Sequence, residues 1–147
     1  DSCRHGTWVA HLGEVKVNLT PGGVWTKRFT CAHDGGQIIH PEGLRIVIEG
    51  NLVQATSRTL FEEVQFDADR VKSVDWATYP ILDIADAPQA IEIELVNRPE
   101  IAPSGGGDPS TRTVPAAIAN AIFDATGVRL RKVPLTPQRM KEALARA

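Results

Sequence analysis

The alternation of apolar and polar residues predicts several short β-strands. Leu12 to Leu19 alternates, a Pro-Gly-Gly turn follows, and Val24 to Cys31 continues as a second run, which is typical of a hairpin. Ala90 to Val96 alternates in the same way, with its isoleucines and leucine on one face. Glu63 to Phe66 and Val71 to Val74 predict two further short strands, and we expect residues 76–87 to form an irregular connection.

A different spacing of apolar residues predicts a long amphipathic helix over 41–60. Pro41 suits its first turn, and the residues at helical spacing are Leu44, Val47, Ile48, Leu52, Ala55 and Leu60. Gly50 lies inside this helix, where glycine costs about 1 kcal/mol relative to alanine. We therefore expect Gly50 to pack closely against another backbone.

Two more helices are predicted in the last third of the chain. The first spans about 114–126, with Thr113 as N-cap, Pro115 in the first turn and Gly127 as C-cap. Its predicted buried stripe is Val114, Ile118, Ile122 and Ala125. Thr136 and Pro137 open a short charged helix that we expect to reach Ala147.

These elements predict an α+β fold of short, mostly antiparallel strands with two or three helices packed on them. The chain has 147 residues, of which 42% are apolar, so residues 1–147 fit a single domain or a fragment of a larger one. The longest apolar run is far shorter than the roughly 18 residues of a membrane span, which predicts a soluble protein.

Charge and composition exclude several function classes. A net charge of −2 disfavours nucleic-acid binding. The four histidines lack zinc-site spacings, so we expect no metal site, and the GxSxG elbow of Ser-His-Asp hydrolases is absent. Two cysteines are too few for an iron–sulfur cluster, so any such cluster would have to sit on a partner. Cys3 and Cys31 could form a disulfide in an oxidising compartment, but two reduced, buried thiols are favoured.

The most unusual segment is the glycine loop, residues 103–111 (PSGGGDPST). Gly105, Gly106 and Gly107 allow a backbone to approach a flat ligand without interference from Cβ atoms, and would hold Asp108 beside it. The helix that follows adds free N–H groups and a partial positive charge. The alternative is that the loop is a flexible connector and Asp108 an ordinary exposed aspartate. Taken by itself, the loop sequence favours this alternative over a ligand site. A phosphate-binding P-loop is excluded because no Lys-Ser/Thr pair follows the glycines.

Several motifs taken together resemble the C-terminal end of the molybdenum-cofactor-binding large subunit of the xanthine dehydrogenase and aldehyde oxidase family, most closely its isoquinoline 1-oxidoreductase beta-subunit group. The order and spacing agree over nearly the whole chain. The matching segments are residues 31–41 (CAHDGGQIIHP), 48–50 (IEG), 79–82 (YPIL), 103–109 (PSGGGDP) and 115–134 (PAAIANAIFDATGVRLRKVP).

The resemblance implies part of a molybdenum hydroxylase that inserts oxygen from water into an aldehyde or N-heterocycle. It implies a molybdenum–pterin cofactor shared with the rest of the large subunit, and electrons leaving through a small [2Fe–2S] subunit. Asp108 matches the family's catalytic base, and Gly105, Gly106, Gly107 and Val47 match positions beside the cofactor. The family's large subunit is several times longer than this chain, so the chain is expected to be inactive alone.

Four positions depart from the family pattern. Asp108 stands where the family has Glu, and is shorter by one C–C bond, roughly 1.5 Å. Val47 replaces a cofactor-contacting Gln, His40 replaces an Asn and Asn51 replaces a glycine. Two hypotheses follow. The chain is either the C-terminal portion of a working hydroxylase, or a non-catalytic interaction or assembly subunit that keeps the fold without the cofactor site. In both cases we expect apolar faces left exposed for a partner.

Overall fold

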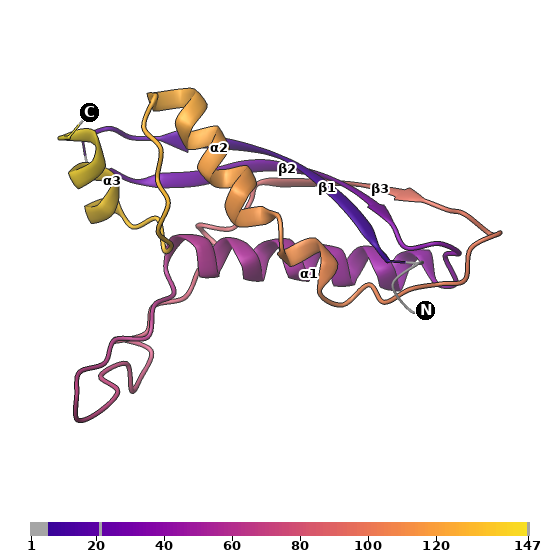
Figure 1. Cartoon of the computed structure of the whole chain (residues 1–147), viewed down its shortest axis with the longest axis horizontal. Coiled ribbons are helices and arrows are strands. Elements are labelled where there is room, and N and C mark those ends of the chain that lie inside the picture. The colour runs from indigo at the N-terminus through magenta and orange to yellow at the C-terminus, as the bar shows by residue number, and fades with distance from the viewer. Residues whose placement is uncertain (1–5, 21, 147) are drawn as a thin grey trace.

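A computed structural model describes residues 6–20 and 22–146. Figure 1 shows a curved sheet lying over one long helix, with a shorter helix crossing beside it. The strands are β1 (Trp8–Val17), β2 (Val24–Asp34) and β3 (Ala90–Val96), and the helices are α1 (Pro41–Leu60), the 3-10 helix η2 (Pro109–Thr111), α2 (Val114–Thr126) and α3 (Pro137–Leu144). The predicted α+β class is confirmed.

The sheet has the order β1-β2-β3 and mixed direction. β1 and β2 form the predicted hairpin, from the pair Trp8 and Asp34 to the pair Val17 and Val24. β3 runs parallel to β2. The expected antiparallel pairing therefore holds for β1 and β2 only. The physical reason is the crossover: α1 and a long connection separate β2 from β3, so the chain returns to the starting end of β2 before it pairs again.

One face of the sheet carries the core. Phe29 and Cys31 of β2 are fully buried against Ile48 and Leu52 of α1 and a row of residues from α2. That row is Val114, Ile118 and Ile122, as predicted. The fourth predicted member, Ala125, is exposed. Alternate residues of β1 and β3 point to the other face, which is open.

α1 begins and ends where the sequence predicts. His40 caps its N-terminus, because its Nδ1 accepts a hydrogen bond from the Gly43 backbone N–H at 2.7 Å. The buried positions include the predicted Ile48, Leu52, Ala55 and Leu60, while Leu44 is half-buried and Val47 is 42% exposed. The prediction for Gly50 is wrong within the described residues, since no atom lies within 4 Å of a Cβ built there.

The ends of the last two helices follow their capping residues. Gly127 ends α2 with a φ of +72°, the left-handed conformation that favours glycine. Thr136 caps α3 by accepting from the Arg139 N–H. This helix ends at Leu144, short of the predicted Ala147, which lies outside the described residues.

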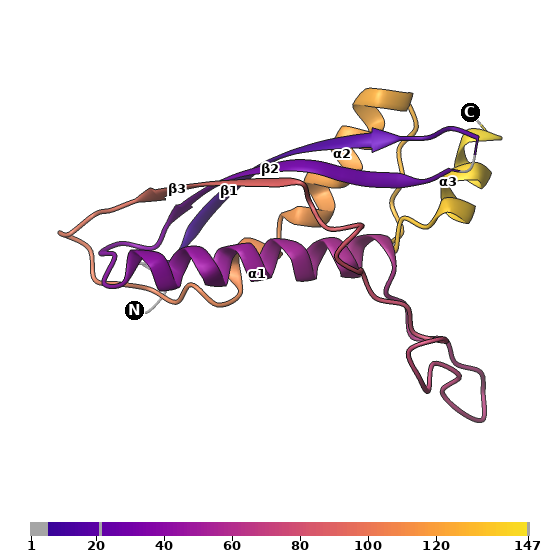
Figure 2. The ribbon, with the colours of Figure 1, turned by 180° about the vertical axis from the view of Figure 1, so that it is seen from behind.

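The connection between α1 and β3, residues 61–89, includes an arm that projects away from the sheet and helices (Figures 1 and 2). The two strands predicted at 63–66 and 71–74 do not form. One isolated bridge joins Phe66 to Val71, because the arm has no third strand or core to stabilise a hairpin. The irregular segment predicted at 76–87 is confirmed. No helix among the described residues is both long and apolar enough to span a bilayer.

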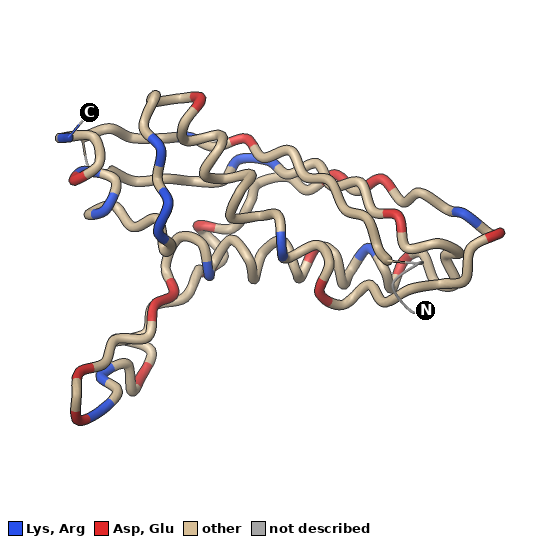
Figure 3. The backbone as a smooth tube through the Cα atoms, in the orientation of Figure 1, with Lys and Arg blue, Asp and Glu red and all other residues tan. Residues whose placement is uncertain are grey.

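Acidic and basic residues are scattered over the backbone, and both kinds occur on the arm (Figure 3). The short basic run of Arg129, Arg131 and Lys132 lies between α2 and α3. It is balanced elsewhere, in keeping with a net charge of −2.

Candidate functional site

The glycine loop, residues 103–111, is fixed to the body of the protein at its start. The Ser104 backbone N–H donates to the Gly35 carbonyl at 2.8 Å, and the Ser104 hydroxyl donates to the same oxygen at 3.1 Å. The Thr7 hydroxyl donates to the Gly105 carbonyl at 3.0 Å and lies 2.6 Å from Ser104 Oγ. The loop therefore starts against the end of β2 and the residue before β1.

The far end of the loop is held by α1. The Asn51 side-chain amide donates to the Gly107 carbonyl, donates to Ser110 Oγ at 2.8 Å and lies 3.4 Å from the Gly106 carbonyl. Ser110 is fully buried. The loop is thus attached on both sides of Asp108, and does not behave as a free connector in this fold.

The three glycines of the loop differ in their surroundings. None of them has a positive φ, so the loop does not use glycine's conformational freedom. A Cβ at Gly106 would lie 2.6 Å from Leu44 Cδ1, so the absence of a side chain there permits close contact with α1. Nothing lies within 4 Å of a Cβ built at Gly105 or Gly107, so no side chain covers the backbone of the loop at these two positions.

Hydrogen bonding in the loop is one-sided. The carbonyls of Gly105 and Gly107 accept from Thr7 and Asn51, and that of Asp108 accepts from Thr111. The backbone N–H groups of residues 105–108 have no acceptor among the described residues. A backbone donor needs a partner, either water or a ligand. The loop therefore offers a short row of donors to whatever covers it.

Asp108 lies at the end of this row and is exposed. It precedes η2, but its carboxylate makes no capping hydrogen bond, and no hydrogen bond or ion pair joins that carboxylate to another described residue. The carboxylate is the one acidic group of the loop, and its oxygens can accept a hydrogen bond from a ligand.

Val47 lies on the same side of α1 as the residues that hold the loop. Leu44 and Asn51, which contact Gly106 and Gly107, are seven residues apart, so they point in nearly the same direction. Val47 lies between them, one turn from each, and is 42% exposed. The predicted site residues of α1 and of the loop are therefore neighbours, although they are about sixty positions apart in sequence.

Behind the loop, His11 connects the sheet to the start of α2. Its Nε2 lies 3.2 Å from Cys31 Sγ, and its Nδ1 lies 2.6 Å from Thr113 Oγ1. Thr113 is the N-cap residue as predicted, but its hydroxyl pairs with His11 rather than capping the helix. Burial lowers the pKa of His11, with a further contribution from His33. Burial also raises the pKa of the Cys31 thiol to about 11, so Cys31 is an uncharged thiol.

Cys31 is buried, as expected, and Cys3 lies outside the described residues. His33 is also buried, and burial lowers its pKa although Asp34 opposes the shift. No group of three His, Cys, Asp or Glu side chains in the described part of the chain is placed to hold a metal ion.

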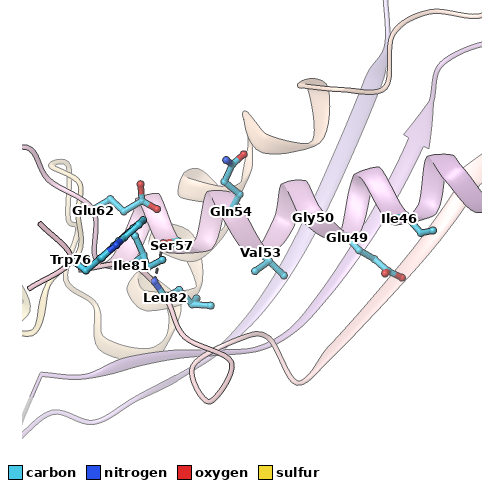
Figure 4. A pocket seen from close by; sticks show the side chains of 10 residues that line it. All are labelled: Ile46, Glu49, Gly50, Val53, Gln54, Ser57, Glu62, Trp76, Ile81 and Leu82. Carbon is cyan, nitrogen blue, oxygen red and sulfur yellow. Dashed lines mark hydrogen bonds between the residues drawn. The ribbon is translucent and has the colours of Figure 1, made fainter. Parts of the chain in front are cut away.

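A large apolar surface lies on the other side of α1. An open groove of about 600 Å³ runs along this helix to the base of the arm (Figure 4). Ile46, Val53 and Trp76 are among the residues that line it. Trp76 is 77% exposed and Trp8 on the sheet is 73% exposed, so these two tryptophans are not core residues. Both are available to anchor an interface, and the expected exposed apolar surface is present.

Comparison with known proteins identifies the family. The family model described as a molybdopterin cofactor-binding domain matches residues 4–88, more than half of the 147-residue chain. The chain belongs to the molybdopterin cofactor-binding domain family. Its resemblance to the molybdenum-binding subunits of xanthine dehydrogenases and aldehyde oxidases is thereby confirmed.

Relatives of this molybdopterin cofactor-binding domain agree with the assignment. One subunit of the nicotinate dehydrogenase of Pseudomonas putida is 42% identical over 93% of the chain. The beta subunit of isoquinoline 1-oxidoreductase from Brevundimonas diminuta is 30% identical over 88% of it. The crystal structure of an aldehyde oxidoreductase from Desulfovibrio desulfuricans superposes with a TM-score of 0.81, at 30% identity over 93% of the chain.

These proteins are much longer than this domain. The chain spans 12% of the nicotinate dehydrogenase subunit, 16% of the isoquinoline oxidoreductase subunit and 15% of the aldehyde oxidoreductase chain. It therefore corresponds to a fragment of the molybdopterin-binding region of such subunits.

Sequence reasoning named the loop and Val47 but missed the contacts that bring them together. Asn51 was noted only as a departure from the family's glycine, and the roles of Thr7 and His11 were not foreseen. The signal for Asn51 was present, since a carboxamide in the middle of a helix on the side of Leu44 needs an acceptor outside that helix. The acceptors themselves lie more than fifty residues away, and only the fold reveals them.

Proposed function

We propose that this chain is the C-terminal portion of a molybdenum hydroxylase large subunit and contributes the loop that holds the active-site carboxylate. Asp108 is the proposed catalytic residue. Gly105, Gly106, Gly107 and Val47 are the proposed cofactor-binding residues. The proposed reaction is the oxidation of an aldehyde or N-heterocycle with water as the source of oxygen.

One observation carries the proposal. Asp108 is exposed and unpaired within the described chain, on a loop that is fixed on both sides by Ser104 and Asn51. A general base needs a free carboxylate held in a defined place, and both conditions hold here. An ordinary surface aspartate on a flexible connector would not be attached in this way.

The residues present fit the molybdenum–pterin cofactor of the family. That cofactor carries phosphate, carbonyl and ring-nitrogen acceptors, and the N–H groups of residues 105–108 are donors without acceptors in the described chain. Val47 presents hydrocarbon beside these donors and can only pack against the cofactor. When bound, the cofactor supplies the two-electron redox chemistry of hydroxylation. This chain supplies donors, an apolar contact and, at Asp108, a carboxylate oxygen that accepts the proton released from water.

The partners follow from the same reading. The relatives are named as subunits, so assembly with other chains is expected. We propose that the remainder of the large subunit covers the groove on α1 and the exposed arm, and that a small subunit carries the [2Fe–2S] centre. The substrate is a small aldehyde or N-heterocycle.

A second candidate is a non-catalytic interaction or assembly subunit. The observation that favours it is the pair of substitutions at the site: Val47 cannot donate a hydrogen bond as the family's Gln does, and Asp108 is shorter than Glu. A misplacement near 1 Å can cost on the order of 10²-fold in rate.

Purification of the protein from its native cell tests the proposal against this alternative. Molybdenum would be quantified by elemental mass spectrometry, and co-purifying chains identified. The proposal expects molybdenum together with an iron–sulfur subunit. A metal-free preparation with unrelated partners would contradict it.

A further inference from the structure

The residue that fixes the position of Asp108 is Asn51. We propose that Asn51 is a positioning residue, which clamps the glycine loop to α1 so that the Asp108 carboxylate is held in place for proton transfer. This inference rests on the proposed function of Asp108, although the clamp itself does not.

The hydrogen-bond partners of Asn51 lie on both sides of Asp108 in the sequence. Its amide group donates to the Gly107 carbonyl, one residue before Asp108, and to Ser110 Oγ, two residues after it. A carboxamide has two N–H donors, and both are used here, with the Gly106 carbonyl as a longer third neighbour at 3.4 Å. The backbone on each side of Asp108 is therefore tied to one side chain.

The orientation of the amide is fixed by its surroundings. Two backbone carbonyls face the side chain, so only the NH₂ end can point toward them, because the amide oxygen would meet two other oxygens. Ser110 is fully buried and Asn51 is half-buried, so water competes poorly for the bond between them. Gly106 packs on Leu44 next to the clamp and limits movement of the loop toward the helix.

The position of Asn51 on α1 makes the clamp rigid. It is one residue before Leu52, which is fully buried in the core, in the middle of a helix of 20 residues. The loop contributes no regular structure of its own between residues 102 and 108. Its geometry near Asp108 is consequently set by α1.

Three variants separate a donor clamp from simple filling of space. Asn51→Asp has the shape of the native residue but no donors, and places a negative charge against two carbonyls. Asn51→Ala removes the side chain, and Asn51→Gln keeps both donors on a longer arm. If Asn51 acts as a clamp, the loop should be most stable in the wild type, less stable in Asn51→Gln, less again in Asn51→Ala and least stable in Asn51→Asp. A space-filling role predicts that Asp is milder than Ala. Asn120→Ala, on an exposed turn of α2, is the matched control.

The experiment uses the protein as purified from its native cell, with the partners it retains. Hydrogen exchange of peptides covering residues 103–111 is measured first, and steady-state kinetics second. We expect Asn51→Ala to speed exchange at least tenfold at Thr111, whose N–H donates to the Asp108 carbonyl, to lower kcat about 10²-fold and to leave KM unchanged. We expect Asn120→Ala to change neither.

The outcomes distinguish the clamp from the proposed function. Unchanged exchange in Asn51→Ala and Asn51→Asp overturns the clamp. Faster exchange with an undiminished kcat, in a protein where Asp108→Asn is inactive, overturns the positioning role. Faster exchange in a protein whose turnover is unaffected by either Asn51→Ala or Asp108→Asn overturns the proposed function of Asp108, and the positioning role with it.

Discussion

The Nδ1 of His11 lies 2.6 Å from the hydroxyl oxygen of Thr113, and so joins the first strand to the N-cap residue of α2. The other ring nitrogen faces the Cys31 sulfur at 3.2 Å. A neutral imidazole has one donor and one acceptor, which suits a thiol on one side and a hydroxyl on the other. A protonated ring would carry two donors in a partly buried place.

This arrangement predicts that acid weakens the fold. Burial holds the pKa of His11 and of His33 below the ordinary value of 6.5, so the unfolded chain takes up protons first as the pH falls. The free energy of unfolding should be nearly constant from pH 7.5 to about 6.5 and fall below that, by at most about 1.4 kcal/mol per pH unit for each histidine. Urea unfolding between pH 7.5 and 5.5 measures this. His11→Gln should show a smaller decrease than the wild type, and an equal decrease would exclude His11 as a cause.

The cap of α1 gives a second prediction. His40 accepts from the Gly43 N–H at the position where the family has Asn. His40→Asn should keep the cap, since Asn is among the preferred N-cap residues, whereas His40→Ala should lower the free energy of unfolding by about 1 kcal/mol. Thermal unfolding of the two variants compares them. Equal losses would show that the ring packs rather than caps.

Gly106 and Gly107 should respond differently to the same change. A methyl group at Gly106 would lie 2.6 Å from the end of the Leu44 side chain, while at Gly107 it would meet nothing within 4 Å. Gly106→Ala should therefore lower stability by about 1 kcal/mol as Leu44 shifts, and Gly107→Ala should be close to neutral. Denaturant midpoints test this pair. A larger cost at Gly107 would contradict the packing described for the loop.

The departures at Val47 and Asp108 can be tested together. If the site is a working one in its present form, restoring the family residues with Val47→Gln and Asp108→Glu should change the molybdenum content or turnover of the purified protein. If the chain is a non-catalytic subunit, neither quantity should change. Metal analysis and an aldehyde oxidation assay on the same preparation give both answers.

The sequence alone predicted the features that neighbouring residues determine, and it did not predict those that depend on distant segments. The boundaries of α1 and the cap at Gly127 were predicted because local spacing and capping residues determine them. The parallel pairing of β3 was not, because strand direction depends on where the crossover returns. The strands expected in the arm did not form, since alternation alone cannot supply a partner face.

The site shows the same division. Sequence motifs identified the loop and Val47 as candidate site residues. They could not show that the two lie close together, because the contact that joins α1 to the loop, from Asn51 to Gly107, spans 56 positions of sequence. The prediction that Gly50 packs against another backbone was wrong, because that face of α1 borders an open groove. Local chemistry was readable, but the contacts between distant segments were not.

The most direct test of the central claim is Asp108→Asn in the assembled protein, with molybdenum, iron and turnover measured on one preparation. The change removes the negative charge and the proton-accepting oxygen but keeps the size of the side chain. The account predicts normal molybdenum and iron content and loss of turnover by at least 10²-fold. Full turnover with an intact metal content would remove Asp108 from the mechanism and contradict the account.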